Sequence, residues 1–129
     1  EFAVRLPFTV ANFVTVFVLY ALILKLTKSH LASFFVAFLF LVNGFVVGFS
    51  RIAQYQNLNL LFSITSLYFF SDFVLKKQNF RKSSFFGSVF ICLSILSHWD
   101  AVFYSIPILY FLISFLLNKN ISTKEKIIN

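Results

Sequence analysis

Uncharged, largely apolar runs alternate along this chain with short polar segments. The runs cover residues 8–24, 31–50, 52–71, 83–99 and 101–118. A bilayer core about 30 Å thick is crossed by about 20 apolar helical residues, and most of the runs come close to that length. The runs are apolar on every face, whereas barrel strands alternate polar and apolar residues over about 10 positions. The pattern therefore predicts an all-α, polytopic transmembrane helix bundle of about five spans.

Composition supports a membrane protein and excludes an ordinary soluble domain. Of the 129 residues, 60% are hydrophobic and 12% are charged, and the mean hydropathy is +0.90. The chain contains no methionine, so we expect residues 1–129 to form a single transmembrane domain that is a fragment of a longer polypeptide. The lone Cys92 excludes a disulfide within the chain, and we expect it to be a small buried residue.

The basic residues fall in alternate gaps between the runs. Nine of the 11 lie in the gaps on one side, and only Arg5 and Arg51 lie in the others. Because Lys and Arg are retained in short cytoplasmic loops, the N-terminus is predicted to be outside and the C-terminus cytoplasmic. This scatter explains the net charge of +7 without a nucleic-acid partner, and it favours contact with anionic membrane lipid. The nine are Lys25, Lys28, Lys76, Lys77, Arg81, Lys82, Lys119, Lys124 and Lys126.

Arg51 stands between two uncharged runs, on the side where positive charge is disfavoured. One interpretation is an anchor whose long side chain reaches the lipid headgroups. The other is a fork of donors that binds a phosphate at the membrane surface. Gln54, Tyr55 and Gln56 follow closely, and such a group of uncharged polar residues favours the phosphate site over the anchor.

His98 and Asp100 flank Trp99 in the second polar segment on the outer side. Trp99 is typical of the aromatic belt at a membrane interface. The His and Asp could form an acid/base pair, a metal site or a solvated turn. Because the other histidine, His30, is predicted to face the cytoplasm, a metal site made of protein ligands alone has little support. No cofactor is evident, and the sequence leaves a divalent-metal requirement open.

Three local features predict how the helices pack. Gly44 and Gly48 form a GxxxG step, which favours close approach of a neighbouring helix. Asp72 precedes Lys76 by one helical turn, so a local ion pair is expected there. Pro107 lies within the fifth run and is expected to kink it.

Three segments of the outer side resemble a known family. They are RLP at 5–7, SRIAQYQ at 50–56 and LSILSHWD at 93–100. In order and spacing they resemble the GT-C glycosyltransferases, particularly the family 39 type related to protein O-mannosyltransferases and the lipid A aminoarabinose transferase. The resemblance extends over nearly the whole chain.

The resemblance implies an activity and a location. Such an enzyme transfers a sugar from a polyprenyl-phosphate carrier to an acceptor at the extracytoplasmic face, and we expect an integral multi-pass protein of a bacterial plasma membrane. The leaving phosphate needs cationic stabilisation and the acceptor hydroxyl needs a base. By resemblance, Arg51 is a phosphate contact and His98 occupies a position where the family often has a basic residue. The candidate substrate-binding residues are Arg5, Arg51, Gln54, Gln56, His98 and Asp100.

The chain departs from the family pattern at its carboxylates. The family's catalytic Asp or Glu would fall in an outer loop before Glu1, so the catalytic base is unassigned within this chain. A second acidic position appears here as Gln54 or Gln56. Asp100 is the candidate substitute, and without the missing base the fragment alone is expected to be inactive.

A transporter or flippase segment is the alternative from another functional class. It should carry ionisable residues or broken helices near the bilayer midplane. Here the runs are nearly free of charge at mid-depth, and polar groups gather at one surface, which favours chemistry on a lipid-linked substrate. A purely structural subunit would leave the outer polar residues unexplained.

Overall fold

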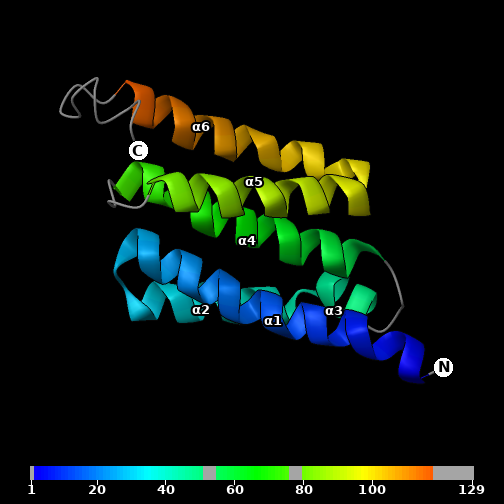
Figure 1. Cartoon of the computed structure of the whole chain (residues 1–129). Helices are drawn as coiled ribbons and strands as arrows, with labels where there is room; N and C mark the ends of the chain where they lie inside the picture. Colours follow the sequence, from blue (N-terminus) through cyan, green and yellow to red (C-terminus); the bar gives the residue numbers. More distant parts are fainter. Residues whose placement is uncertain (1, 51–54, 76–79, 118–129) are drawn as a thin grey trace.

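The computed structural model describes residues 2–50, 55–75 and 80–117, and every regular element in these ranges is a helix. The predicted all-α polytopic bundle is confirmed. Successive passes run in opposite directions, so each helix lies antiparallel to the next pass (Figure 1). The elements are α1 (Phe2–Thr27), α2 (His30–Val42), α3 (Gly44–Ser50), α4 (Tyr55–Leu75), α5 (Phe80–Ser97), the 3-10 helix η1 (Trp99–Tyr104) and α6 (Ser105–Leu116).

The alternation of passes gives the bundle two ends. At one end, on the right of Figure 1, α1 and α4 begin and α3 and α5 end; we call this the outer end. The inner end is the one where α1 ends, α2 begins, α4 ends and α5 begins. The basic side chains Lys25, Lys28 and Lys82 belong to the inner end, which the charge distribution predicts to be cytoplasmic.

Four of the described helical segments are long and apolar enough to cross a membrane: Ala3–Thr27, Tyr55–Leu75, Phe80–Ser97 and Trp99–Leu116. The second apolar run differs from the prediction, because it is divided into α2 and α3 at Asn43 instead of forming one continuous span. The described helices still run back and forth in five passes, of which α2 and α3 together make the second (Figure 1).

Asn43 ends α2 and begins α3. Its backbone is extended, with φ −66° and ψ 117°, and its N–H donates to the carbonyl of Phe40 at 3.3 Å. Its side-chain Oδ1 accepts the N–H of Val46 at 3.3 Å, which is the bond of a helix N-cap. The asparagine thus satisfies backbone groups that a break inside a membrane would otherwise leave exposed.

The close helix approach expected at Gly44 and Gly48 occurs elsewhere. No described atom lies within 4 Å of a Cβ built at either glycine, so the GxxxG prediction is wrong for this part of the chain. At Gly87 of α5, by contrast, a Cβ would lie 2.8 Å from the Phe70 ring of α4. Ser66 donates to the Gly87 carbonyl at 2.8 Å, so α4 and α5 pack closely at this glycine.

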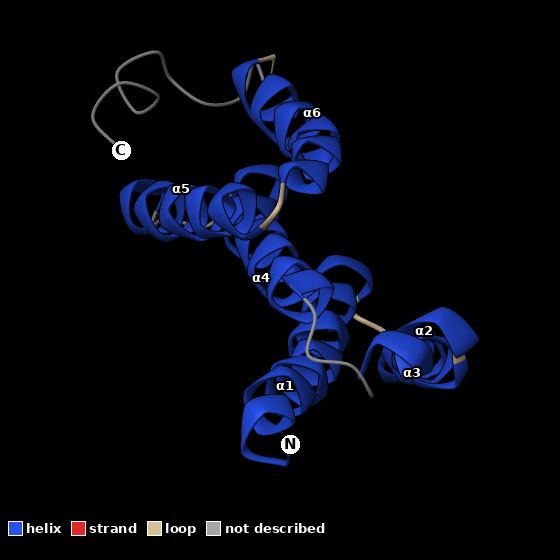
Figure 2. Cartoon of the chain, turned by 90° about the vertical axis from the view of Figure 1, so that its right-hand side faces the viewer, coloured by secondary structure: helices blue, strands red, loops and turns tan. Residues whose placement is uncertain are grey.

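Helix α4 is the centre of the bundle, and polar side chains line its contacts. Figure 2 shows it between α1 on one side and α5 and α6 on the other, with α2 and α3 set apart. Asn57, Ser63 and Ser66 of α4 are buried, and Ser63 shares a 2.6 Å hydrogen bond with Ser94 of α5. Large apolar side chains such as Phe13 and Leu96 face outward. Polar groups inside and apolar groups outside are what a lipid environment requires.

At the inner end a buried ion pair joins α1 to α4. Lys25 Nζ lies 3.1 Å from Asp72 Oδ1, and the two side chains are 6% and 13% exposed. Lys25 also donates to the carbonyl of Tyr68 at 2.5 Å, and Ser83 of α5 donates to Asp72 Oδ2 at 2.7 Å. Asp72 therefore pairs across helices; Lys76, its expected partner, lies outside the described residues.

Two smaller expectations also change. Cys92 is exposed on α5 instead of buried. Pro107 stands in the first turn of α6, where a missing N–H removes no intrahelical bond. The irregularity of the last pass comes before this proline, in η1.

Candidate functional site

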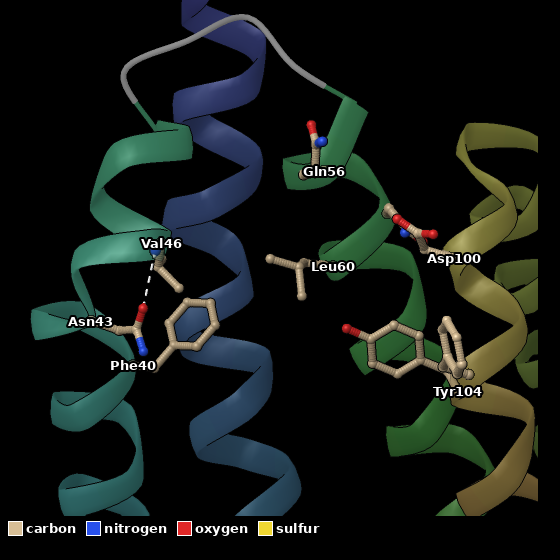
Figure 3. Close-up of a pocket in the computed structure, with 9 residues that line it drawn as sticks. Phe40, Asn43, Val46, Gln56, Leu60, Asp100 and Tyr104 are labelled. Carbon is tan, nitrogen blue, oxygen red and sulfur yellow. Dashed lines mark hydrogen bonds between the residues drawn. The ribbon is translucent and has the colours of Figure 1, made fainter.

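A pocket of about 720 Å³ opens near the outer end. Its walls are α2 and α3 on one side and η1 on the other, and α4 lies between them (Figure 3). The volume falls in the range of small-molecule sites. The described residues that line it are Phe40, Asn43, Val46, Gln56, Asn59, Leu60, Asp100, Phe103 and Tyr104.

Asp100 is the carboxylate of this pocket, and His98 lies beside it. His98 Nδ1 lies 2.9 Å from Asp100 Oδ2 and 3.3 Å from the Asp100 N–H. One nitrogen cannot donate and accept at once, so the tautomer selects one of these two bonds. The His98 ring is stacked on Tyr55, with centroids 4.1 Å apart and planes 13° apart. The Asp100 side chain is still 44% exposed, so it is accessible to a ligand.

The α4 wall contributes two amides of different character. Asn59 Oδ1 accepts hydrogen bonds from Ser63 and from Ser94, so its orientation is fixed by α4 and α5. Gln56 Oε1 is buried, and no hydrogen-bond partner for it occurs among the described residues. A buried polar atom without a partner costs free energy, which a bound hydroxyl or water would recover.

The remaining polar groups come from opposite sides. Asn43 on the α2–α3 side uses its Oδ1 to cap Val46, shown by the dashed line in Figure 3. Tyr104 points its hydroxyl toward the pocket from η1 (Figure 3). The pocket thus combines three amides, a phenol and a carboxylate with apolar walls, the usual composition of a site for a polar ligand.

The structure brings together some of the predicted site residues. Gln56 and Asp100 line the same pocket, and His98 contacts Asp100 without itself being among the described lining residues. Arg5 is exposed on α1 and is likewise not among them. Arg51 and Gln54 lie outside the described residues.

Sequence reasoning missed the three other polar lining residues, Asn43, Asn59 and Tyr104. Asn59 follows Gln56 by three positions and Tyr104 follows Asp100 by four, so helical spacing could have placed each beside its predicted neighbour. Asn43 precedes Gly44, and an Asn-Gly pair inside an apolar run is a signal for a break.

Comparison with known families identifies the chain. The profile of a family described as dolichyl-phosphate-mannose-protein mannosyltransferase matches residues 1–128. The chain belongs to this mannosyltransferase family. The resemblance to GT-C glycosyltransferases is thereby confirmed. No curated protein and no solved structure matches the chain significantly.

Membership of the mannosyltransferase family and four apolar helices together indicate an integral membrane protein of the glycosyltransferase class. Within the described ranges, no three His, Cys, Asp or Glu side chains gather where they could hold a metal ion. What this pocket offers chemically is one accessible carboxylate beside a histidine, together with amide and phenol groups that can bind hydroxyls.

Proposed function

We propose that this chain forms part of an enzyme that transfers a sugar from a polyprenyl-phosphate carrier to an acceptor at the extracytoplasmic face of a bacterial plasma membrane. The observation that carries the proposal is the outer-end pocket of about 720 Å³, which is lined by both Asp100 and Gln56, whose buried Oε1 has no described hydrogen-bond partner. The charge distribution predicts that this end faces outward.

Asp100 is the proposed acid/base or hydroxyl-binding group. A carboxylate can take the proton of an acceptor hydroxyl as the sugar is transferred, or it can hold a sugar hydroxyl in place. When His98 Nδ1 carries the proton, its bond to Oδ2 fixes the direction of the carboxylate, and the stacking of His98 on Tyr55 holds the imidazole in place. His98 is therefore a positioning residue in this proposal.

Sugar hydroxyls would be bound by Gln56, Asn59 and Tyr104, which line the pocket with Asp100. The phosphate of the carrier needs a cation, and Arg51 is the proposed contact because its guanidinium can make two parallel bonds to phosphate oxygens. Arg5 is a second candidate, since it lies near the beginning of α1, at the same outer end. No cofactor held by this segment is needed for these roles, and assays with and without EDTA would measure any divalent-metal requirement.

The test is an Asp100→Asn variant of the full-length protein, assayed with polyprenyl-phosphate-linked sugars as donors. Asparagine keeps the size but loses the base, so turnover should fall about 10²–10⁴-fold if Asp100 transfers a proton. Cys92→Ser, an exposed change on α5, is the matched control and should keep wild-type turnover. Wild-type turnover by a folded Asp100→Asn protein would remove Asp100 from the mechanism.

The divided second pass is the one observation that favours a transporter or flippase, because such proteins use broken helices at their sites. A proteoliposome assay separates the two functions. A flippase moves the lipid-linked sugar between leaflets without an acceptor, whereas the proposed enzyme consumes it only when an acceptor is supplied.

A further inference from the structure

Three hollows lie around Tyr68 toward the inner end, and Lys25 lines two of them. The first, of about 430 Å³, is lined by Lys25, Lys28 and His30; we call it the headgroup pocket. The second, of about 320 Å³, lies toward α5 and includes Lys82 and Ser83. The third, of about 300 Å³, is almost wholly apolar; we call it the apolar groove. Tyr68 lines all three, so the hollows lie around one side chain, and we refer to them together as the inner-end region.

The charge of this region is positive. Asp72 pairs with Lys25 at 3.1 Å, so these two charges offset one another. Lys28 at the headgroup pocket and Lys82 at the second hollow then supply the excess positive charge. His30 adds a further polar group, because its Nδ1 bonds the Tyr20 hydroxyl at 2.9 Å. If that hydroxyl donates, the ring proton stands on Nε2 and is available to a ligand.

Lys28 occupies an unusual backbone position. Its φ of 58° makes it the only non-glycine residue with a positive φ in the described ranges. Its N–H donates to the Leu24 carbonyl at 2.9 Å, which ends α1 in the left-handed manner that normally favours glycine. A lysine at this strained turn holds a cation beside the headgroup pocket, and such strain is often found where a side chain has a function.

The apolar groove continues from the headgroup pocket toward the middle of the bundle. Ala21 and Tyr68 belong to both, while Phe17 and Val18 extend the groove by one turn along α1. Lys25 Nζ lies 4.1 Å from the centre of the Tyr68 ring, so the tyrosine joins the charged part to the apolar part. A ligand that fits both parts carries an anionic head and a hydrocarbon chain.

We propose that the inner end binds an anionic phospholipid, with its phosphate at Lys28 in the headgroup pocket and one acyl chain in the apolar groove, while Lys82 in the neighbouring hollow adds to the positive charge that attracts it. Basic pockets between helices on the cytoplasmic side commonly bind anionic headgroups. The inner end lies opposite the outer pocket, so this lipid is distinct from the sugar carrier of the proposed reaction. A polyprenyl phosphate bears the same chemistry and is included in the test as a competitor.

The experiment uses the full-length protein in nanodiscs of phosphatidylcholine with increasing phosphatidylglycerol. Native mass spectrometry then counts the phosphatidylglycerol molecules retained by each protein. Lys28→Gln and Lys82→Gln should each weaken retention about fivefold, because a surface lysine contributes about that factor to anionic-lipid binding. Ala21→Phe should also weaken it, because the ring would fill the wall shared by the headgroup pocket and the groove. Added salt should reduce retention by the wild type.

Arg81→Gln is the matched control, since Arg81 is basic, exposed and adjacent to Lys82 but does not line these hollows. It should retain phosphatidylglycerol as the wild type does. Equal losses in Lys28→Gln and Arg81→Gln would show general attraction to the membrane surface and overturn the site. Displacement of phosphatidylglycerol by an equal amount of polyprenyl phosphate would assign the site to the carrier and overturn the phospholipid proposal. Thermal melting confirms that each variant is folded.

Discussion

The carboxylates at the two ends of the bundle differ in their partners and in their exposure to solvent. At the inner end, Asp72 is held by Lys25 and Ser83 from two neighbouring helices, and its side chain is 13% exposed. At the outer end, Asp100 meets His98 from its own segment, and its side chain is 44% exposed. The first carboxylate joins helices together, while the second remains accessible to a ligand.

This difference assigns a stabilising role to the inner-end carboxylate and a functional role to the outer-end one. A buried charge surrounded by partners is costly to expose, so its loss should unfold the bundle. An accessible carboxylate contributes little to stability and can change its partner during a reaction. The same residue type thus has a structural role at one end and a proposed catalytic role at the other.

The largest expected effect is on stability at the inner end. Asp72→Ala should lower the free energy of unfolding by about 3–5 kcal/mol, because it leaves Lys25 buried without its partner. Thermal and denaturant unfolding in detergent would measure the loss. The comparable Asp100→Ala change should cost no more than about 1 kcal/mol. Similar losses at the two ends would contradict the comparison.

The next largest effect concerns turnover at the outer end. Arg51→Ala in the full-length enzyme should reduce turnover on the order of 10²–10³-fold, as when one transition-state donor is removed. Arg51→Lys should reduce it less, since lysine keeps the charge but loses the fork of donors. An arginine that only anchors the helix at the headgroups would accept lysine without loss. Transfer assays on both variants distinguish these roles.

A smaller effect is expected from Ser83 at the inner end. Ser83→Ala removes the 2.7 Å hydrogen bond to Asp72 and should cost about 1.5–3 kcal/mol, the usual range for a bond to a charged group. Ser88→Ala, at an exposed position of the same helix, serves as the control in the same melting experiment. If the Ser83→Ala and Ser88→Ala variants have the same melting temperature, Ser83 does not stabilise the ion pair.

The smallest effect sharpens the difference between the ends. Gln56→Leu replaces a buried acceptor that has no described partner, so stability should stay within about 1 kcal/mol of the wild type or rise. Turnover should fall about tenfold if Gln56 binds a sugar hydroxyl, which is the value of one neutral hydrogen bond. Parallel measurements of melting and transfer are needed. A large loss of stability would place Gln56 among the structural residues instead.

The sequence was sufficient for the helices and for their alternating direction, because apolar runs and basic gaps are local signals. It was insufficient for the rotation of each helix about its axis. Runs that are apolar on every face do not indicate which side packs inward, so Cys92 was misplaced. The pair of Lys25 with Asp72 depends on the same rotation and was missed for that reason.

The candidate site was predictable to a similar degree. Topology alone predicts that Gln56 and Asp100 lie near one another. Gln56 is in the first turn of α4 and Asp100 follows α5, so both lie at the outer end. Asn43 depends on a break in a run that otherwise resembles one continuous span. The Asn-Gly pair at this position indicates a turn, but the hydrophobic residues around it favoured the prediction of one unbroken helix.

The break at Asn43 has a consequence for the bilayer itself. Helix α2 has 13 residues, which at about 1.5 Å each span about 20 Å of a hydrocarbon core of about 30 Å. With the start of α2 set at the inner hydrocarbon boundary, Asn43 lies about 10 Å below the outer one by the same estimate. Helix α3, with 7 residues, spans about the remaining 10 Å by the same estimate. We expect the polar break between the two helices to draw water toward the outer pocket, so that a water-borne acceptor can meet a lipid-anchored sugar without either leaving its own phase.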